Sequence, residues 1–202
     1  MFITFEGIDG CGKTTQAQLL AEYLRAQGKD VLLLREPGGT ELSELVRTIL
    51  LNKNFAYPLS REAELLLFAA SRAQLIREVI RPALEKKTVV ILDRFTDSTI
   101  AYQGFARGVS LDHIKHINLA ATGGLEPDIT FVLDIPVEVA FERRAGSFID
   151  RIEAEDEDFH IKVREGYWYL ASLYHRIRSI DGTASIEEIQ NTIREMVAKL
   201  RS

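Results

Sequence analysis

The chain has 202 residues, of which 46% are hydrophobic and 27% charged, and its formal net charge is −5. These values fit a globular protein and exclude a disordered chain, which would need less apolar content and more net charge. The acidic balance argues against nucleic acid as a partner, because surfaces that bind it are usually basic. A single cysteine, Cys11, excludes an internal disulfide and a cysteine-rich zinc site.

The start of the chain carries no sign of export. Met1 leads directly into an apolar run, without the basic start and cleavage site of a secretory signal. No apolar stretch approaches the ~20 residues needed to span a bilayer. We therefore expect a cytoplasmic protein with no membrane partner, built as one domain over residues 1–202.

Short apolar runs alternate with longer amphipathic stretches along the chain. The apolar runs predict strands at residues 2–6, 31–34, 88–92, 129–134 and 178–181. The amphipathic stretches predict helices at residues 13–27, 41–51, 61–87 (with a break at Pro82), 97–104, 111–123, 136–145, 159–175 and 185–200.

This order of elements predicts the fold class and the edge of the sheet to search. Strands separated by helices form βαβ units, so we expect an α/β protein with a five-stranded parallel sheet and helices on both faces. Ligands in such folds bind beyond the carboxyl ends of the strands. The loops after Glu6, Leu34, Leu92 and Asp134 are therefore the candidates.

The first of these loops matches the phosphate-loop pattern G-x-x-x-x-G-K-[ST] in full, which indicates a P-loop NTPase fold. Its glycines let the backbone wrap closely around a phosphate, and the next helix directs its positive end there. Lys13 is expected to neutralise the β- and γ-phosphates of ATP, and Thr14 to ligate Mg²⁺. The predicted ATP-binding residues are Gly7, Ile8, Asp9, Gly10, Cys11, Gly12, Lys13, Thr14 and Thr15.

Two residues near this loop allow more than one interpretation. Cys11 could be a thiolate of lowered pKa at a helix N-terminus, or a small side chain at a position that the motif leaves free; we favour the second. Asp93 ends the third apolar run and resembles the P-loop aspartate that orients Mg²⁺, although many strands end in Asp. Beside a phosphate loop, Asp93 is a predicted metal residue.

The chain does not read as a GTPase. The guanine-reading motif Asn-Lys-x-Asp is missing, since the one Asn-Lys pair, Asn52-Lys53, is followed by Asn54 and Phe55. The size fits a small-molecule kinase best.

Three further segments, taken with the phosphate loop and the Phe5-Glu6 that precedes it, closely resemble the bacterial thymidylate kinase family. They stand in the order and spacing usual for that family, from residue 2 to about residue 165. The segments are Arg35-Glu36-Pro37-Gly38-Gly39-Thr40, the pair Phe68 and Arg72 on one helix face, and Asp93-Arg94-Phe95 followed by Ser98 through Gly104. The resemblance implies a reaction in which ATP and dTMP give ADP and dTDP, for dTTP synthesis.

The resemblance also implies roles for the acceptor residues. Phe68 would stack on thymine, Arg72 would meet its O4, and Thr99 or Ser98 its N3 edge. Arg47 and Arg94 would hold the dTMP phosphate, because an arginine fork suits a phosphate. Asp9 would lie near the sugar 3′-hydroxyl and Mg²⁺, and Tyr102 would close over C2′. The full dTMP-binding set is Asp9, Glu36, Pro37, Arg47, Phe68, Arg72, Arg94, Ser98, Thr99, Tyr102 and Gln103, and the metal set is Thr14, Asp93 and Asp9.

Without the resemblance, three residues of this set could also have purely structural roles. Phe68 and Tyr102 could be ordinary core side chains, and Arg47 a solvated helix residue. Arg72 weakens that interpretation of Phe68, because an arginine on the same face needs an acceptor.

The phosphate loop carries no arginine, so another segment must supply the catalytic one. The polar segment at about residues 143–157 follows the fourth strand and its helix, where related kinases carry a lid. The lid of this chain is shorter and less basic than that of many relatives, and a solvated charged loop is the alternative. A closed lid would exclude water and prevent wasteful ATP hydrolysis. Arg151 is the first choice and Arg143 the second, so the predicted catalytic set is Lys13, Arg94, Arg151, Arg143 and Asp9.

Other functions remain possible at this point. Another nucleoside-monophosphate kinase would carry different motifs at Arg72 and Tyr102. A P-loop ATPase acting through a protein partner would be indifferent to dTMP. A deoxynucleoside kinase would need a general base, for which Glu36 is the obvious candidate. The resemblance implies a homodimer, which the sequence itself does not reveal.

Overall fold

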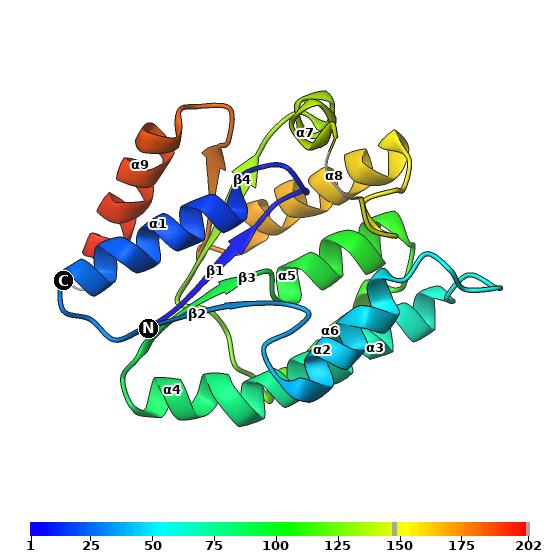
Figure 1. Ribbon diagram of the computed structural model, residues 1–202, viewed down its shortest axis with the longest axis horizontal. Helices are drawn as coiled ribbons and strands as arrows, with labels where there is room; N and C mark the ends of the chain where they lie inside the picture. The colour runs from blue at the N-terminus through cyan, green and yellow to red at the C-terminus, as the bar shows by residue number, and fades with distance from the viewer. Residues whose placement is uncertain (147–148, 201–202) are drawn as a thin grey trace.

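Five parallel strands form one sheet in the computed structural model, which describes residues 1–146 and 149–200 (Figure 1). Residues 147–148 of the predicted lid and residues 201–202 lie outside the described part. The strands are β1 (Phe2–Glu6), β2 (Val31–Arg35), β3 (Val89–Asp93), β4 (Ile129–Asp134) and β5 (Ile177–Asp181), in the spatial order β2-β3-β1-β4-β5. All four pairings are parallel, which confirms the predicted sheet.

The middle of the sheet is the core of the protein. Every residue of β1 is buried, and Phe5 packs on Phe131 of β4 with ring centroids 5.4 Å apart. Strand β2 lies at an edge and is only half-buried. The continuous apolar runs of these strands agree with this burial, because helices cover both faces of the sheet.

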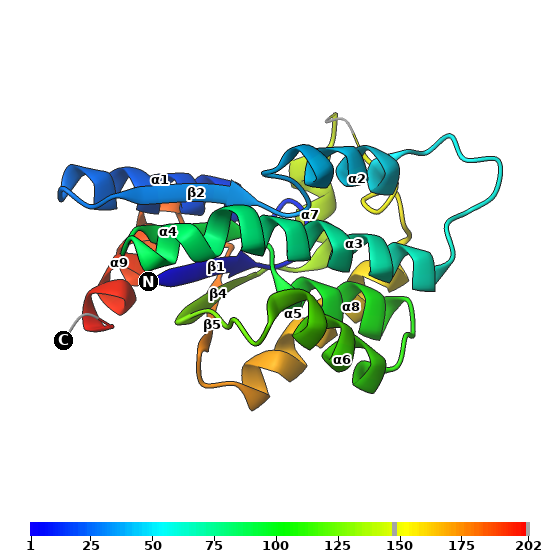
Figure 2. The same cartoon turned by 90° about the horizontal axis from the view of Figure 1, so that it is seen from below.

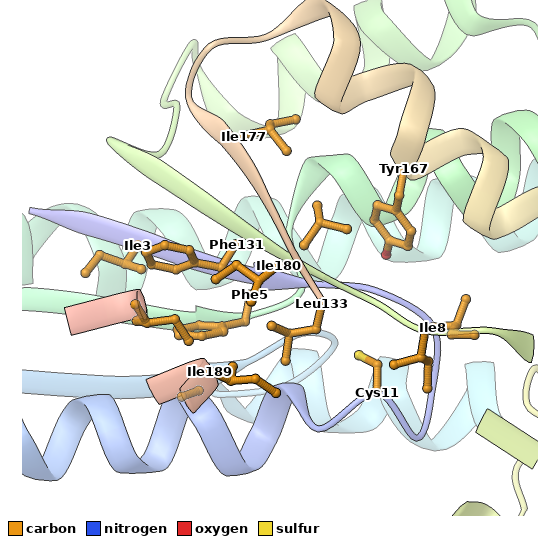
Figure 3. Close-up of a cluster of buried hydrophobic side chains, with 14 of the residues drawn as sticks. Ile3, Phe5, Ile8, Cys11, Phe131, Leu133, Tyr167, Ile177, Ile180 and Ile189 are labelled. Atoms are coloured by element: carbon orange, nitrogen blue, oxygen red, sulfur yellow. The ribbon is translucent and has the colours of Figure 1, made fainter. Parts of the chain in front are cut away.

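Helices cover both faces of the sheet. Helix α1 (Lys13–Ala26) packs on β1, β2 and β3 and against α9 (Ile186–Lys199). On the other face, α4 (Arg81–Glu85) packs on β3, and α8 (Glu157–Leu173) packs on β4 and β5. Figure 3 shows Ile189 of α9 on the side of α1 and Tyr167 of α8 across the sheet.

The remaining helices extend the molecule beyond the sheet. Helices α2, α3 and α6 pack together at the end away from α9 (Figure 2). The remaining bounds are α2 (Glu41–Leu51), α3 (Arg61–Leu75), the π-helical η1 (Ile76–Ile80), α5 (Thr96–Thr99), the π-helical η2 (Ile100–Ala106), α6 (Leu111–Thr122) and α7 (Val137–Arg144).

Three of the predicted helices differ from those observed. The predicted helix 97–104 is the short α5 followed by the π-helical η2, which extends to Ala106. The predicted helix 61–87 is a run of α3, η1 and α4, in which the π-helical turn precedes Pro82, whose ring has no N–H for the α-helical pattern. The predicted helix 159–175 begins earlier, at Glu157, because the Asp156 carboxylate accepts the N–H of Phe159 at 2.9 Å and caps the helix. The part of the predicted polar segment beyond Asp156 is therefore helical.

Among the described residues, no helix combines the length and the apolar content needed to cross a membrane.

Candidate active site

A cavity of about 510 Å³ opens beyond the carboxyl ends of β1 and β3. Its walls come from the phosphate loop, the loop after β2, helices α2 and α3, the segment from Asp93 to Gln103, and the region after α7. Four predicted site residues, Gly7, Ile8, Cys11 and Arg151, do not line it. The predicted residues that do are Asp9, Gly10, Gly12, Lys13, Thr14, Thr15, Glu36, Pro37, Arg47, Phe68, Arg72, Asp93, Arg94, Ser98, Thr99, Tyr102, Gln103 and Arg143.

The phosphate loop joins β1 to α1 in a conformation that needs its glycines. Gly7 has φ +132° and Gly10 φ +89°, and a Cβ would lie 2.5 Å from the Leu133 carbonyl oxygen at the first and 2.8 Å from the Ala140 oxygen at the second. Gly12 caps α1 in a left-handed conformation, so the first N–H groups of α1 are presented at the cavity. This is the geometry of an anion site at a helix N-terminus.

The side chains of Ile8 and Cys11 point into the core rather than the cavity (Figure 3). Both residues can therefore contact a phosphate only through their backbone. Burial raises the pKa of the Cys11 thiol, although Lys13 acts in the other direction. This raised pKa supports the interpretation of Cys11 as a small packing residue.

Thr14 and Asp93 meet at the start of α1 and the end of β3. The Thr14 hydroxyl donates to Asp93 Oδ2 at 2.6 Å. Within the described residues, no three His, Cys, Asp or Glu side chains gather as a metal centre. A hydroxyl and one or two carboxylates nevertheless fit Mg²⁺, which keeps several waters and takes further oxygens from substrate phosphates.

Arg94 is the central cation of the cavity. It follows β3 in the left-handed region at φ 71°, which aims its side chain back over the phosphate loop. One terminal nitrogen donates to Asp9 and to the Tyr102 hydroxyl, and the other donates to Ser98 Oγ at 3.1 Å and to the Tyr167 hydroxyl at 3.3 Å. These bonds fix the guanidinium in one position.

Two cations, Arg94 and Lys13, lie beside Asp9 and explain how a carboxylate can be present in the phosphate loop. Burial alone would raise the pKa of Asp9, but Arg94 and Lys13 hold it well below its ordinary value. Lys13 Nζ lies 3.6 Å from Asp9 Oδ1 and also donates to the Ile8 carbonyl oxygen at 3.0 Å. Asp9 is therefore ionised, and its charge is balanced within the site.

Behind Arg94 lies a buried carboxylate, Glu6, that was not among the predicted site residues. Glu6 accepts the Phe95 N–H at 2.7 Å and hydrogen bonds from the Ser98 and Tyr167 hydroxyls. The sequence feature that could have identified Glu6 is a carboxylate at the end of an apolar strand. For Tyr167, the only such feature was its place on the inner face of a helix.

Arg72 is almost fully buried, and the protein itself occupies its donors. The guanidinium donates to Glu36 Oε2 at 2.8 Å, to Thr99 Oγ1 and Asn118 Oδ1 at 2.9 Å, and to the Phe95 carbonyl oxygen at 3.0 Å. Arg72 therefore has acceptors within the protein and does not depend on a ligand to supply one. Its edge still lines the cavity, beside Glu36 Oε1, which has no hydrogen-bond partner among the described residues.

The cavity wall beyond Arg72 carries the other predicted acceptor residues. Phe68 lies one turn before Arg72 on α3, half-buried, with a face on the cavity. Gln103 donates its amide to Glu64 at 2.8 Å, and Arg47 donates to the Pro37 carbonyl oxygen at 3.1 Å. Because all of these side chains border the same cavity, a planar base and an anionic group could be bound together here.

The arginines near the predicted lid fall into two groups. Arg143 and Arg144 line the cavity, and Arg143 donates to the Gly182 carbonyl oxygen at 3.1 Å. Arg151 points away from the cavity, donating to the Leu50 carbonyl oxygen at 2.8 Å and to Glu64 at 2.7 Å. Of the two predicted lid arginines, only Arg143 therefore lines the cavity, and the choice between them stays a prediction. Arg144, which also lines the cavity, was not among the predicted site residues, because nothing in its spacing marked it.

A parallel sheet, a phosphate loop and a cavity lined by arginines define a P-loop phosphotransferase. A family model described as thymidylate kinase matches residues 5–193. The chain belongs to the thymidylate kinase family.

Individual relatives agree along almost the whole chain. The thymidylate kinase of Caldanaerobacter subterraneus subsp. tengcongensis is 52% identical over 194 residues, covering 95% of this chain and 92% of that protein. The thymidylate kinase of Thermosipho melanesiensis is 49% identical over 197 residues, covering 98% and 97%. The crystal structure of thymidylate kinase from Ehrlichia chaffeensis superposes with a TM-score of 0.80 at 38% identity, covering 98% of each chain.

Proposed function

We propose that this protein is a thymidylate kinase that transfers the γ-phosphoryl group of ATP to dTMP, giving ADP and dTDP for dTTP synthesis. One observation carries the proposal: the phosphate loop and the predicted acceptor residues line the same cavity. Two anionic nucleotides bound there would meet end to end between Lys13, Arg94 and Arg143. Fixed cations would stabilise the charge that spreads over the transferred group.

The acceptor would lie with its phosphate between Arg47 and Arg94 and its base against Phe68. The edge of the base would meet Arg72 and Thr99, and in addition either Gln103 or Ser98. Glu36 and Pro37 would complete this wall of the cavity. Tyr102, whose hydroxyl donates to Asp9 at 3.1 Å, would stand at the sugar and disfavour a 2′-hydroxyl. Since dTMP presents a phosphate anion as nucleophile, no residue has to act as a strong general base.

Magnesium is part of the proposal. The residues that would hold it are Thr14 and Asp93, with Asp9 in its outer surroundings, and their oxygens match the preference of Mg²⁺. The ion would supply charge neutralisation of the β- and γ-phosphates when bound.

For the catalytic arginine of the predicted lid, we propose Arg143, with Arg144 beside it. Both reach the cavity from the end of α7. Arg151, the first choice from the sequence, is engaged by Glu64 outside it. A cation already paired with a buried carboxylate is less available to a phosphoryl group.

The decisive experiment measures ADP release with ATP and Mg²⁺ across a panel of nucleoside monophosphates and thymidine. We expect dTMP to be the best acceptor and dUMP a poor second, because dUMP lacks the methyl group of thymine and would leave its space in the cavity empty. Hydrolysis of ATP at an equal rate with and without dTMP would favour an ATPase that works through a protein partner. Thymidine acting as a better acceptor than dTMP would favour a deoxynucleoside kinase with Glu36 as base.

We further infer that residues 1–202 act as one domain, as a homodimer, in the cytoplasm. The family model extends over nearly all of the chain, which supports one domain. Exposed apolar side chains on α2, α3 and α6, namely Leu45, Leu66 and Leu119, support an interface between copies. Light scattering of the purified protein would measure the mass; a monomer at micromolar concentration would contradict the dimer.

A further inference from the structure

Outside the cavity, one buried carboxylate collects donors from two other segments. Glu64 of α3 is 1% exposed. Its Oε1 accepts from the Gln103 amide at 2.8 Å and from Arg107 Nε at 3.3 Å. Its Oε2 accepts from Arg151 at 2.7 Å and from the second Arg107 nitrogen at 3.3 Å. Gln103 and Arg107 belong to the η2 region, and Arg151 belongs to the lid turn, which we define as residues 150–155.

The partners of Glu64 are themselves tied to their surroundings. Arg151 also donates to the Leu50 carbonyl oxygen at 2.8 Å, at the end of α2. Arg107 forms an ion pair with Glu155 at 2.7 Å and lies 4.6 Å from the ring centroid of Phe159. The lid turn is thus held at both ends, by Arg151 near its start and by Glu155 at its end.

The charges in this cluster balance. Arg107 and Arg151 face Glu64 and Glu155, so two cations meet two carboxylates. Burial alone would raise the pKa of Glu64, but Arg107 and its hydrogen-bond partners lower it, and Glu64 is ionised. Removing one carboxylate from this set leaves a partly buried arginine without its partner. The resulting loss of stability exceeds that of the hydrogen bond alone, because the charge stays buried.

The same cluster lies directly behind one wall of the cavity. Phe68 stands one turn after Glu64 on α3, Gln103 lines the cavity while bonded to Glu64, and Asp150, Ile152 and Glu153 of the lid turn line it too. Three segments that form this wall therefore share one buried anion.

We propose that Glu64 is a positioning residue for the transfer reaction. It holds Gln103 and the lid turn against α3, and so sets both the fit of the acceptor and the exclusion of water from the reacting phosphates. Arg151, on this view, fastens the lid turn and does not touch the phosphoryl group. The inference rests on the proposed function, since it concerns the acceptor end of the same cavity.

The test uses the full chain with Glu64→Gln, which keeps the size of the side chain but removes its charge. The matched control is Glu62→Gln on the same helix, where an exposed side chain pairs with Arg61 and does not reach the cluster around Glu64. We expect Glu64→Gln to raise the KM for dTMP about tenfold or more, in line with the loss of charged hydrogen bonds. ATP hydrolysis without acceptor should rise several-fold, while Kd for ATP stays within about twofold, because the phosphate loop is untouched.

A second variant, Arg151→Gln, separates a fastening role from a catalytic one. Arg151 is partly exposed, so this protein should fold even where Glu64→Gln does not. If Arg151 fastens the lid turn to Glu64, its variant raises the KM for dTMP and ATP hydrolysis, and adding Glu64→Gln raises ATP hydrolysis little further. The KM for dTMP should still rise in the double variant, because Gln103 also loses its carboxylate partner. If Arg151 is catalytic, Arg151→Gln lowers kcat at saturating substrates, and the two effects multiply.

The outcomes distinguish this inference from the proposed function. An inactive wild-type protein with dTMP would overturn the function. An active wild type in which Glu64→Gln matches Glu62→Gln in KM and in ATP hydrolysis would overturn the role of Glu64 alone. So would a double variant whose effects on ATP hydrolysis multiply.

Discussion

Glu6 allows a prediction about stability that can be worked out from its surroundings. The side chain is completely buried and accepts bonds from the Phe95 N–H, the Ser98 hydroxyl and the Tyr167 hydroxyl. Burial, with a smaller effect of Asp97, raises the pKa of Glu6 from 4.5 to about 7. The folded protein therefore binds this proton more tightly than the unfolded chain does.

The direction and size of the effect follow from linkage. The stabilisation is complete below pH 4.5, the pKa of the unfolded chain, and is lost as the pH rises through about 7. A rise from 4.5 to about 7 corresponds to about 3 kcal/mol, at ~1.4 kcal/mol per pH unit. Glu6→Gln has no such proton, so its stability lacks this contribution at every pH.

Urea unfolding followed by far-UV circular dichroism, from pH 5 to pH 8, measures the effect. The free energy of unfolding of the wild type minus that of Glu6→Gln should fall by about 2 to 3 kcal/mol over this range. Taking the difference cancels the other titrating groups. A difference that stays level within about 0.5 kcal/mol, or that grows with pH, would refute the assignment of a raised pKa to Glu6.

Three further predictions concern two cavity residues and one buried histidine. Arg143→Ala should lower kcat about 100-fold, since a cation at the transferred phosphoryl is lost; an equal kcat for variant and wild type in the ADP-release assay would contradict this. Phe68→Ala should raise the KM for dTMP about tenfold, as expected for a lost base–aromatic stack, with the KM for ATP unchanged; equal changes in both would point to a purely structural role. His160 is buried with neither ring nitrogen hydrogen-bonded in the described structure, and burial lowers its pKa. The unfolded chain takes up this proton below pH 6.5, so the wild type should lose stability relative to His160→Phe as the pH falls from 8 to 5.5; urea midpoints that run in parallel would rule this out.

The sequence by itself determined the features whose physical cause is local. The strands at residues 2–6 and 129–134 follow from uninterrupted apolar runs, and the phosphate loop follows from glycines that alone tolerate its conformation. Alternation of strand and helix was enough to predict the parallel sheet and the edge at which ligands bind. Helix boundaries were less certain because caps such as Asp156 depend on single hydrogen bonds.

Only the tertiary structure decided where the charged side chains point. The positions of Arg143 and Arg151 in the sequence do not show which of them reaches the cavity. The packing of α3 places Glu64 beside Arg151, whereas Arg143 lines the cavity. The sequence could not show the acceptors of Arg72, because only the fold brings Glu36 and Asn118 to it. Such partners lie far apart along the chain and are brought together by the order of the strands and the packing of the helices. Sequence motifs and hydrophobic periodicity therefore cannot predict these contacts.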